Sequence, residues 1–175
     1  MTKYFAALAL LFLTMCSFTP ENSNSSEPHI KWMNWDEMQK AQAKHPKKVF
    51  VDVYTDWCGW CKRMDATTFE NPKIAKYMSD NYYCVKFNAE THDKIVFKGQ
   101  EYATDGRYSS LATFLLQNRM SFPTTLYFDE DLNMISAVPG YMDPKMAEPI
   151  LNYFVSNSFK TTPWEEYQKN FKSTL

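Results

Sequence analysis

Two apolar segments of strand-like length stand out in the pattern of hydrophobic and polar positions. Residues 48–54 read K-V-F-V-D-V-Y and residues 82–88 read Y-Y-C-V-K-F-N, and both are rich in β-branched and aromatic side chains. Segments of this length and composition are typical of strands in a buried sheet. The residues between them are helical in pattern, first to about residue 67 and then over 72–81, with a break near Pro72. A helical connection predicts that the two strands run parallel.

The rest of the pattern predicts further helices and two hairpins. Asn34 and Glu37 form a capping box at the start of a predicted helix. Helices are expected at residues 35–44, 109–119 and 144–157, with a last short helix from about 163 to 172. The segments 95–97 with 101–103, and 124–128 with 134–138, are expected to pair as antiparallel hairpins.

Apolar residues at helical spacing indicate which helix faces are buried. They are Leu111, Phe114 and Leu115 in the helix 109–119, Met146, Ile150, Leu151 and Phe154 in the helix 144–157, and Trp164, Tyr167 and Phe171 in the last helix. We expect the last set to pack on the body of the domain, and a partner-binding face is the alternative.

The start of the chain has the composition of a targeting signal. Lys3 precedes an apolar run over residues 5–13, and a polar stretch rich in Ser and Asn follows. The run is too short to span a bilayer as a permanent helix, and it lacks the polar face of a buried amphipathic helix. We therefore expect a signal peptide at residues 1–16 and a flexible linker at residues 17–31.

Cys16 raises the question of a lipid anchor. The stretch L-T-M-C-S around it resembles a bacterial lipoprotein cleavage box, apart from Met15, where the strict form has a small residue. If the resemblance holds, Cys16 is the lipidated first residue of the mature chain. If it does not, Cys16 leaves with the signal.

Composition narrows the class of protein. The chain has 175 residues, of which 45% are hydrophobic, and this suffices for one domain with a core. The formal net charge of −1 gives no reason to expect nucleic acid or an anionic membrane surface as partner. After processing, Cys58, Cys61 and Cys84 remain, which indicates one working pair and one buried structural thiol rather than a disulfide scaffold.

Cys58 and Cys61 lie where the first strand turns into a helix. Unpaired N–H groups at a helix N-terminus stabilise a thiolate, so the pair is suited to thiol–disulfide exchange. A purely structural disulfide is the alternative, but its very small loop would gain little chain entropy. Asp52 lies six residues earlier in the apolar strand, and a buried carboxylate without a full partner has a raised pKa.

A metal site is the other use of two cysteines at this spacing. Zinc needs about four ligands. The other candidate ligands are Cys84, His29, His45 and His92, and none of them stands at the spacing of a second pair. We therefore expect neither a metal nor another cofactor.

The stretch D-V-Y-T-D-W-C-G-W-C-K over residues 52–62, the later F-P-T over 122–124 and the closing strand–strand–helix order resemble the thioredoxin superfamily. The resemblance covers about residues 32–157. It implies an α/β thioredoxin-like fold, with a central mixed sheet flanked by helices. The segment 91–120 adds a small hairpin insertion, and residues 158–175 form a C-terminal helical extension. Trp60 stands where typical thioredoxins have proline. This departure resembles a branch of bacterial extracytoplasmic thioredoxin-like proteins.

The resemblance also implies roles for residues near the cysteines. Cys58 would attack a substrate disulfide, and Cys61 would resolve the mixed disulfide. Asp52 matches the family's proton acceptor for the second cysteine, and Lys86 matches a lysine that lies near this acid. An ordinary buried ion pair is the alternative reading of Asp52 and Lys86.

A second group of residues is implied to bind substrate. Pro123 matches the family's cis-proline opposite the cysteines, which leaves the backbone of Phe122 free to pair with an extended substrate. Trp57 and Trp60 would form an apolar rim where a peptide docks, although Trp57 could simply pack the edge of the site. Gly59 would let a partner's sulfur approach closely.

Together these features predict an exported thiol–disulfide oxidoreductase that acts on protein disulfides, in the reductive direction. It would be periplasmic or lipid-anchored at the outer face of a bacterial membrane, and would receive electrons from a membrane protein. A non-catalytic client-binding module is one alternative. An oxidase or isomerase that uses the same cysteine pair is another.

Overall fold

The computed structural model describes residues 28–104 and 106–174. The predictions for residues 1–27, which include the signal peptide and Cys16, lie outside the described residues. Within the described ranges, no helix combines the length and the apolar character that crossing a membrane requires.

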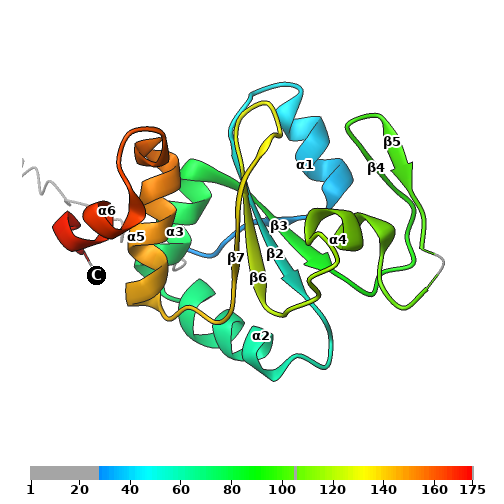
Figure 1. The fold of residues 1–175 in the computed structure, drawn as a ribbon, viewed down its shortest axis with the longest axis horizontal. Coiled ribbons are helices and arrows are strands. Elements are labelled where there is room, and N and C mark those ends of the chain that lie inside the picture. The colour runs from blue at the N-terminus through cyan, green and yellow to red at the C-terminus, as the bar shows by residue number, and fades with distance from the viewer. Residues whose placement is uncertain (1–27, 105, 175) are drawn as a thin grey trace, which may run out of the picture.

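A five-stranded mixed sheet forms the centre of the molecule (Figure 1). Its strands lie in the order β1-β3-β2-β6-β7. Strands β1, β3 and β2 run parallel to one another, whereas β6 runs antiparallel to both of its neighbours, β2 and β7. The strands are β1 (Trp32–Met33), β2 (Lys48–Tyr54), β3 (Tyr82–Asn88), β6 (Thr124–Phe128) and β7 (Met134–Pro139). This confirms the bounds predicted for β2, β3 and β6 and the parallel pairing of β2 with β3.

Helices cover both faces of the sheet, and a separate hairpin extends from one side (Figure 1). The helices are α1 (Trp35–Gln42), α2 (Gly59–Met64), a π-helix (Asp65–Phe69), α3 (Pro72–Asn81), α4 (Ser110–Leu115), α5 (Pro144–Val155), a 3-10 turn (Ser158–Lys160) and α6 (Trp164–Asn170). The hairpin is formed by β4 (Ile95–Phe97) and β5 (Gln100–Tyr102), one residue earlier in its second strand than predicted. The predicted capping box of Asn34 and Glu37 is present at the start of α1.

The alternation of side chains along β2 divides the core into two clusters. Val49, Val51 and Val53 pack with α1, α4 and the β4–β5 hairpin on one face. Phe50 packs with α2, α3 and α5 on the other. Asp52 shares the parity of Phe50, so the strand carries its carboxylate toward the second face, on the side of the cysteine helix.

Two side chains that the helical pattern assigned to the core are instead exposed. Phe114 in α4 is 58% exposed and Met146 in α5 is 52% exposed. Helix α4 stops at Leu115, rather than at residue 119, because Gln117 and Asn118 adopt left-handed backbone angles that end a helix. The short helix buries Leu111 and Leu115, and Phe114 lies off that face.

The C-terminal extension packs on α5, as its apolar spacing predicts. The rings of Trp164 and Tyr167 lie 5.2 and 4.8 Å from the ring of Tyr153. The Tyr153 hydroxyl donates a hydrogen bond to the carbonyl of Thr162 at 2.6 Å. The tail beyond α6 is held as well, since the N–H of Thr174 donates to a carboxylate oxygen of Glu148 at 2.7 Å.

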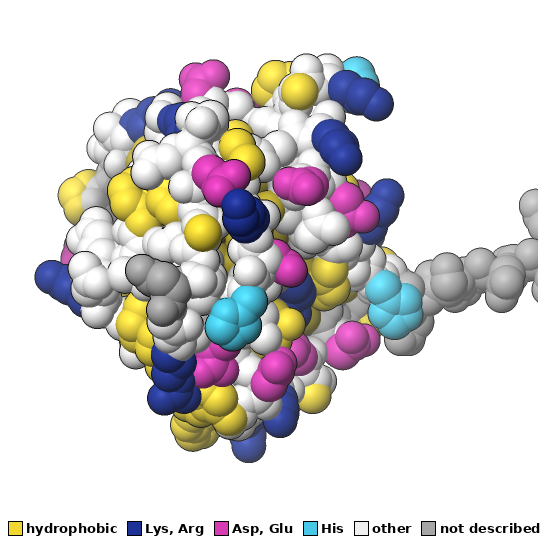
Figure 2. Space-filling model, turned by 90° about the vertical axis from the view of Figure 1, so that its right-hand side faces the viewer, with side chains coloured by type: hydrophobic (Ala, Val, Ile, Leu, Met, Phe, Trp, Pro, Cys, Tyr) yellow, Lys and Arg dark blue, Asp and Glu magenta, His cyan; other side chains and the backbone are white. Residues whose placement is uncertain are grey.

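The surface over the β4–β5 side of the molecule carries charges of both signs. Lysine and arginine side chains alternate there with aspartate and glutamate rather than forming a field of one sign (Figure 2). This distribution agrees with the small net charge of the chain. At the N-terminal edge, Ile30 is buried and the carbonyl of His29 accepts a hydrogen bond from Ser79, so the described end of the segment 17–31 packs on the domain.

The assignment of the faces of α4 can be tested by truncating two of its side chains. Leu111→Ala should lower the free energy of unfolding by about 2–5 kcal/mol, because it opens a cavity at a fully buried position. Phe114→Ala on the same helix is the matched control and should cost less than about 1 kcal/mol. Chemical denaturation followed by circular dichroism measures both, and equal losses would contradict the observed helix orientation.

Candidate active site

The cysteines occupy the turn between β2 and α2. Cys58 is the N-cap of α2, and Cys58 and Cys61 form a disulfide with their Cα atoms 5.3 Å apart. The backbone N–H of Cys61 donates to the Cys58 sulfur at 3.0 Å. Cys58 is the more exposed of the two, as expected, but both residues are buried, at 4% and 1% exposure. A side chain at Gly59 would meet nothing within 4 Å, so the space beside the disulfide is open there.

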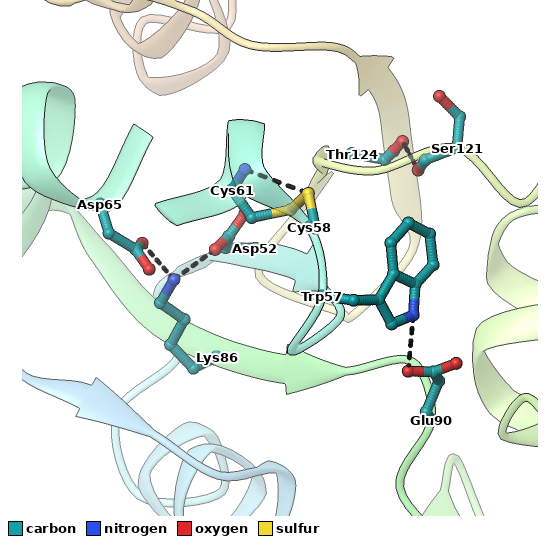
Figure 3. Close-up of a disulfide and its surroundings, with 9 residues drawn as sticks. All are labelled: Asp52, Trp57, Cys58, Cys61, Asp65, Lys86, Glu90, Ser121 and Thr124. Atoms are coloured by element: carbon teal, nitrogen blue, oxygen red, sulfur yellow. Dashed lines mark hydrogen bonds and ion pairs between the residues drawn. A yellow bond between two sulfur atoms is a disulfide. The ribbon is translucent and has the colours of Figure 1, made fainter. Parts of the chain in front are cut away.

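Asp52 is fully buried on the Cys61 side of the disulfide (Figure 3). Its Oδ2 lies 2.6 Å from the ammonium of Lys86, while its Oδ1 has no hydrogen-bond partner among the described residues. Burial raises the pKa of Asp52 to about 6, and the charge of Lys86 opposes this rise without cancelling it. Asp52 is therefore a carboxyl group that exchanges a proton near neutral pH.

Lys86 bridges two carboxylates rather than one. Its ammonium pairs with Asp52 and with Asp65, the first residue of the π-helix. Burial disfavours the charge on Lys86, but the ion pairs with Asp52 and Asp65 outweigh burial and raise its pKa. A cavity of about 510 Å³ is lined in part by Tyr54, Lys86 and Asn88, and the Lys86 side chain is 22% exposed.

Asp65 was not singled out from the sequence. The available signal was an acidic residue four positions after Cys61, one helical turn away. The π-helix that begins at Asp65 changes the helical register there, and π-helical turns are frequent at functional sites.

Two exposed tryptophans flank the disulfide. Trp57 is 57% exposed and Trp60 is 59% exposed, as expected of an apolar rim. The indole N–H of Trp57 donates to a carboxylate oxygen of Glu90 at 2.9 Å (Figure 3). The ring of Trp60 lies 5.4 Å from the ring of Tyr141. Glu90 and Tyr141 were not predicted, since both come from segments distant in sequence.

The loop before β6 reaches the same place. Thr124 pairs with Val53, which sets Pro123 beside the end of β2 that leads into the cysteine turn. The Phe122–Pro123 peptide bond is cis, as the resemblance implied. The carbonyl of Pro123 accepts from the N–H of Gly140 at 2.8 Å, whereas the backbone groups of Phe122 have no partner in the described part of the chain. The ring of Phe122 lies 6.0 Å from that of Trp57.

Among the residues that the structure describes, the expected site residues thus lie around the disulfide, whereas Cys84 lies apart and Cys16 is outside the described part of the chain. Cys84 is a free thiol in β3, buried in the second core cluster, and burial raises its pKa to about 12. In residues 28–104 and 106–174, no group of three or more His, Cys, Asp or Glu side chains is arranged to hold a metal ion.

The burial of Asp52 predicts a pH-dependent stability. Because the folded chain holds this proton up to about pH 6 and the unfolded chain releases it near 3.8, the free energy of unfolding should fall as the pH rises between these values. A shift of this size corresponds to about 3 kcal/mol. In the oxidised protein, Asp52→Asn should therefore be more stable than wild type at pH 7 by up to this amount, and nearly equal to it at pH 4.

Urea denaturation at the two pH values measures this difference. Asp56→Asn, at an exposed aspartate of the same turn, serves as control and should change stability little at either pH. A loss of stability in Asp52→Asn at pH 7 would contradict the raised pKa.

Comparisons with known proteins agree with this geometry. The family model described as thioredoxin-like domain matches residues 35–155. Thiol:disulfide interchange protein DsbD from Haemophilus influenzae (strain PittEE) is 28% identical over 127 residues, and DsbD from Yersinia pestis is 26% identical over 132 residues. Both alignments cover 70% of this chain but only 19% and 20% of the relatives, so the chain spans about a fifth of their length.

Solved structures show the same fold at lower sequence identity. A thioredoxin-fold protein from Helicobacter pylori has a TM-score of 0.54 at 17% identity, covering 71% of this chain and 79% of its own. The DsbH oxidoreductase has a TM-score of 0.53 at 13% identity, covering 79% and 95%. Since the family match extends over more than half of the chain, the protein belongs to the thioredoxin-like domain family, with the Cys-x-x-Cys pair of a thiol–disulfide oxidoreductase.

Proposed function

We propose that this protein is an exported thiol–disulfide oxidoreductase that reduces disulfides in protein substrates. The observation that carries the proposal is the buried carboxyl of Asp52 on the Cys61 side of the Cys58–Cys61 disulfide, where one of its oxygens has no partner among the residues that the structure describes. A purely structural disulfide gains nothing from a buried titrating acid beside it. A catalytic pair of thiols must lose protons when it is oxidised, and a nearby carboxylate can accept one of them.

In the proposed reaction, the Cys58 thiolate of the reduced protein attacks one sulfur of a substrate disulfide. A mixed disulfide forms, and the other substrate sulfur leaves as a thiolate that takes up a proton. Cys61 then gives its proton to Asp52 and attacks the Cys58 sulfur. The second substrate thiol is released and the protein is left with the Cys58–Cys61 disulfide. Two electrons pass from the protein dithiol to the substrate.

Asp52, Lys86 and Asp65 form the proposed route for the proton. The ammonium of Lys86 contacts both carboxylates, one buried and one partly exposed. The side chains of Lys86 and Asp65 are partly exposed, so water would take up the proton from this group. Lys86 lowers the cost of an ionised Asp52 in the core, and it keeps the pKa of Asp52 near the working range of a general base.

The surroundings of the disulfide support the binding of an extended peptide. The free N–H and carbonyl of Phe122 would pair with a substrate backbone as one strand pairs with another. Trp57 and Trp60 supply apolar contact area on either side, and Gly59 leaves room for the incoming sulfur.

Location, direction and partners complete the proposal. Residues 1–16 would be a signal peptide, residues 17–31 would include a linker to the domain 32–157, and Cys16 would carry the lipid if it is retained. The W-C-G-x-C-K sequence with Asp52 favours the reductive direction, and DsbD relatives are named for thiol:disulfide interchange. A membrane electron carrier would then re-reduce the protein outside the cytoplasm.

Two cysteine variants test the reaction. Cys61→Ser should accumulate long-lived mixed disulfides with protein substrates, because the resolving thiol is absent. Cys58→Ser should lose exchange activity and accumulate none, which makes it the matched control. Non-reducing electrophoresis and mass spectrometry detect the adducts. If neither substitution changes any activity, the protein is a client-binding module instead.

The reduction potential of the cysteine pair tests the direction of electron flow. We expect a value near that of thioredoxin, about −270 mV, because the disulfide form of a reductant must be stable. Equilibration against defined thiol buffers measures it. A value near −120 mV, as in strong oxidants, would show that the protein inserts disulfides.

A further inference from the structure

Two arginines flank the disulfide, and neither is used in the reaction proposed above. Arg107 comes from the segment between β5 and α4 and lies against Trp57. Arg63 comes from α2 and lies against Trp60. Each guanidinium therefore lies over one of the two exposed tryptophans that border the site.

Arg107 is held in place by three contacts. Its guanidinium carbon lies 5.4 Å from the ring centre of Trp57 and 5.2 Å from that of Tyr108. Its Nε donates to Glu90 at 2.8 Å. No contact to the terminal nitrogens appears in the described part of the chain, so the outer edge of the guanidinium faces solvent beside Trp57. A guanidinium that lies over a ring and is bonded through Nε keeps its terminal nitrogens free to bind a carboxylate with two hydrogen bonds.

Arg63 is held in a similar way beside Trp60. Its guanidinium carbon lies 5.8 Å from the ring centre of Trp60 and 5.9 Å from that of Tyr141. It has no carboxylate partner among the described residues. A shallow depression beside it is lined by Gly59, Trp60 and Arg63, next to the disulfide. A free positive charge thus borders the open space through which a substrate sulfur would approach.

Two carboxylates near the rim, those of Glu90 and Asp65, are engaged by other groups. Both oxygens of Glu90 are occupied, one by Arg107 and one by the indole N–H of Trp57, and these bonds hold the pKa of Glu90 below its usual value. Asp65 pairs with Lys86. Asp56 is exposed and directly precedes Trp57 in the chain, and its charge contributes to the raised pKa of Tyr54. Both oxygens of the carboxylate that contacts the rim are therefore occupied, whereas the two guanidinium groups on the rings of Trp57 and Trp60 keep nitrogens that can bind a substrate.

We propose that the preferred substrate is an extended acidic segment, with Asp or Glu on both sides of the disulfide that is reduced. One carboxylate would bind the outer edge of Arg107 beside Trp57, and the other would bind Arg63 beside Trp60, while the backbone between them pairs with Phe122. This inference rests on the proposed reductase function and names its substrate class.

Three peptides with the same sequence and one disulfide test the proposal, with Glu, Gln or Lys at the flanking positions. The reduced full-length protein is mixed with each peptide in a single turnover, and acid quenching followed by chromatography measures the peptide thiols formed. We expect the Glu peptide to react about five- to tenfold faster than the Lys peptide at low salt. At 1 M salt, where the screening length is about 3 Å, this preference should largely disappear.

The double variant Arg63→Gln/Arg107→Gln should lose the preference for the Glu peptide. Both side chains are exposed, and circular dichroism checks that the fold is kept. Lys40→Gln is the matched control, because it removes the same charge from α1, at the opposite end of the molecule from α2 (Figure 1). It should retain the wild-type ratio of rates.

Equal rates for the three peptides in the wild type, or a preference that survives in the double variant, would overturn the acidic substrate class alone. If the wild type reduces none of the peptides, including the uncharged Gln peptide, the proposed reductase function fails as well.

Discussion

The hydrogen bonding of β2 on both of its edges is the constraint on which the site depends. Asp52 faces Lys86 across the parallel ladder to β3 and Thr125 across the antiparallel ladder to β6. These two registers bring the lysine and the cis-proline loop to the end of β2 that leads into the cysteine turn. A slip of one residue in either ladder would send the side chains of that strand to the opposite face. The chemistry of the cysteines therefore depends on the same pairing that buries Val49, Val51 and Val53.

The buried carboxylate of Asp52 destabilises the central sheet, and its presence is explained by the chemistry of the site. A carboxylate in an otherwise apolar strand loses most of its hydration, and a single ion pair seldom compensates for that loss in full. Lys86 compensates only in part, since one oxygen of Asp52 has no partner in the described part of the chain and the pKa of Asp52 is raised to about 6. Burying a polar group for function rather than stability is common at active sites, where a group must change protonation state near neutral pH. Because Lys86 and Asp65 are partly exposed, they link the buried carboxyl of Asp52 to solvent.

The aromatic side chains have two separate uses in this protein. Inside, rings such as Phe50, Tyr127 and Phe154 pack edge to face or tilted and fill the space between the sheet and α5. Outside, Trp57 and Trp60 stay exposed, and each supports an arginine. An exposed ring that is held by a hydrogen bond or a guanidinium is already ordered, so less side-chain freedom is lost when a substrate covers it. The insertion between β3 and α4 matters here, because it delivers Arg107 to the rim.

The sequence by itself determined the features that depend on neighbouring residues. The bounds of β2, β3 and β6, the capping box of α1 and the cysteines between a strand and a helix all follow from local composition and spacing. The proximity of Asp52 to the cysteines also follows, because the strand that carries Asp52 leads directly into the cysteine turn. Tertiary structure decided which distant side chains meet, such as Asp65 with Lys86 and Glu90 with Trp57 and Arg107. It also decided that Phe114 and Met146 face solvent, because burial depends on where a helix ends and what packs against it, and periodicity within a single segment does not contain that information.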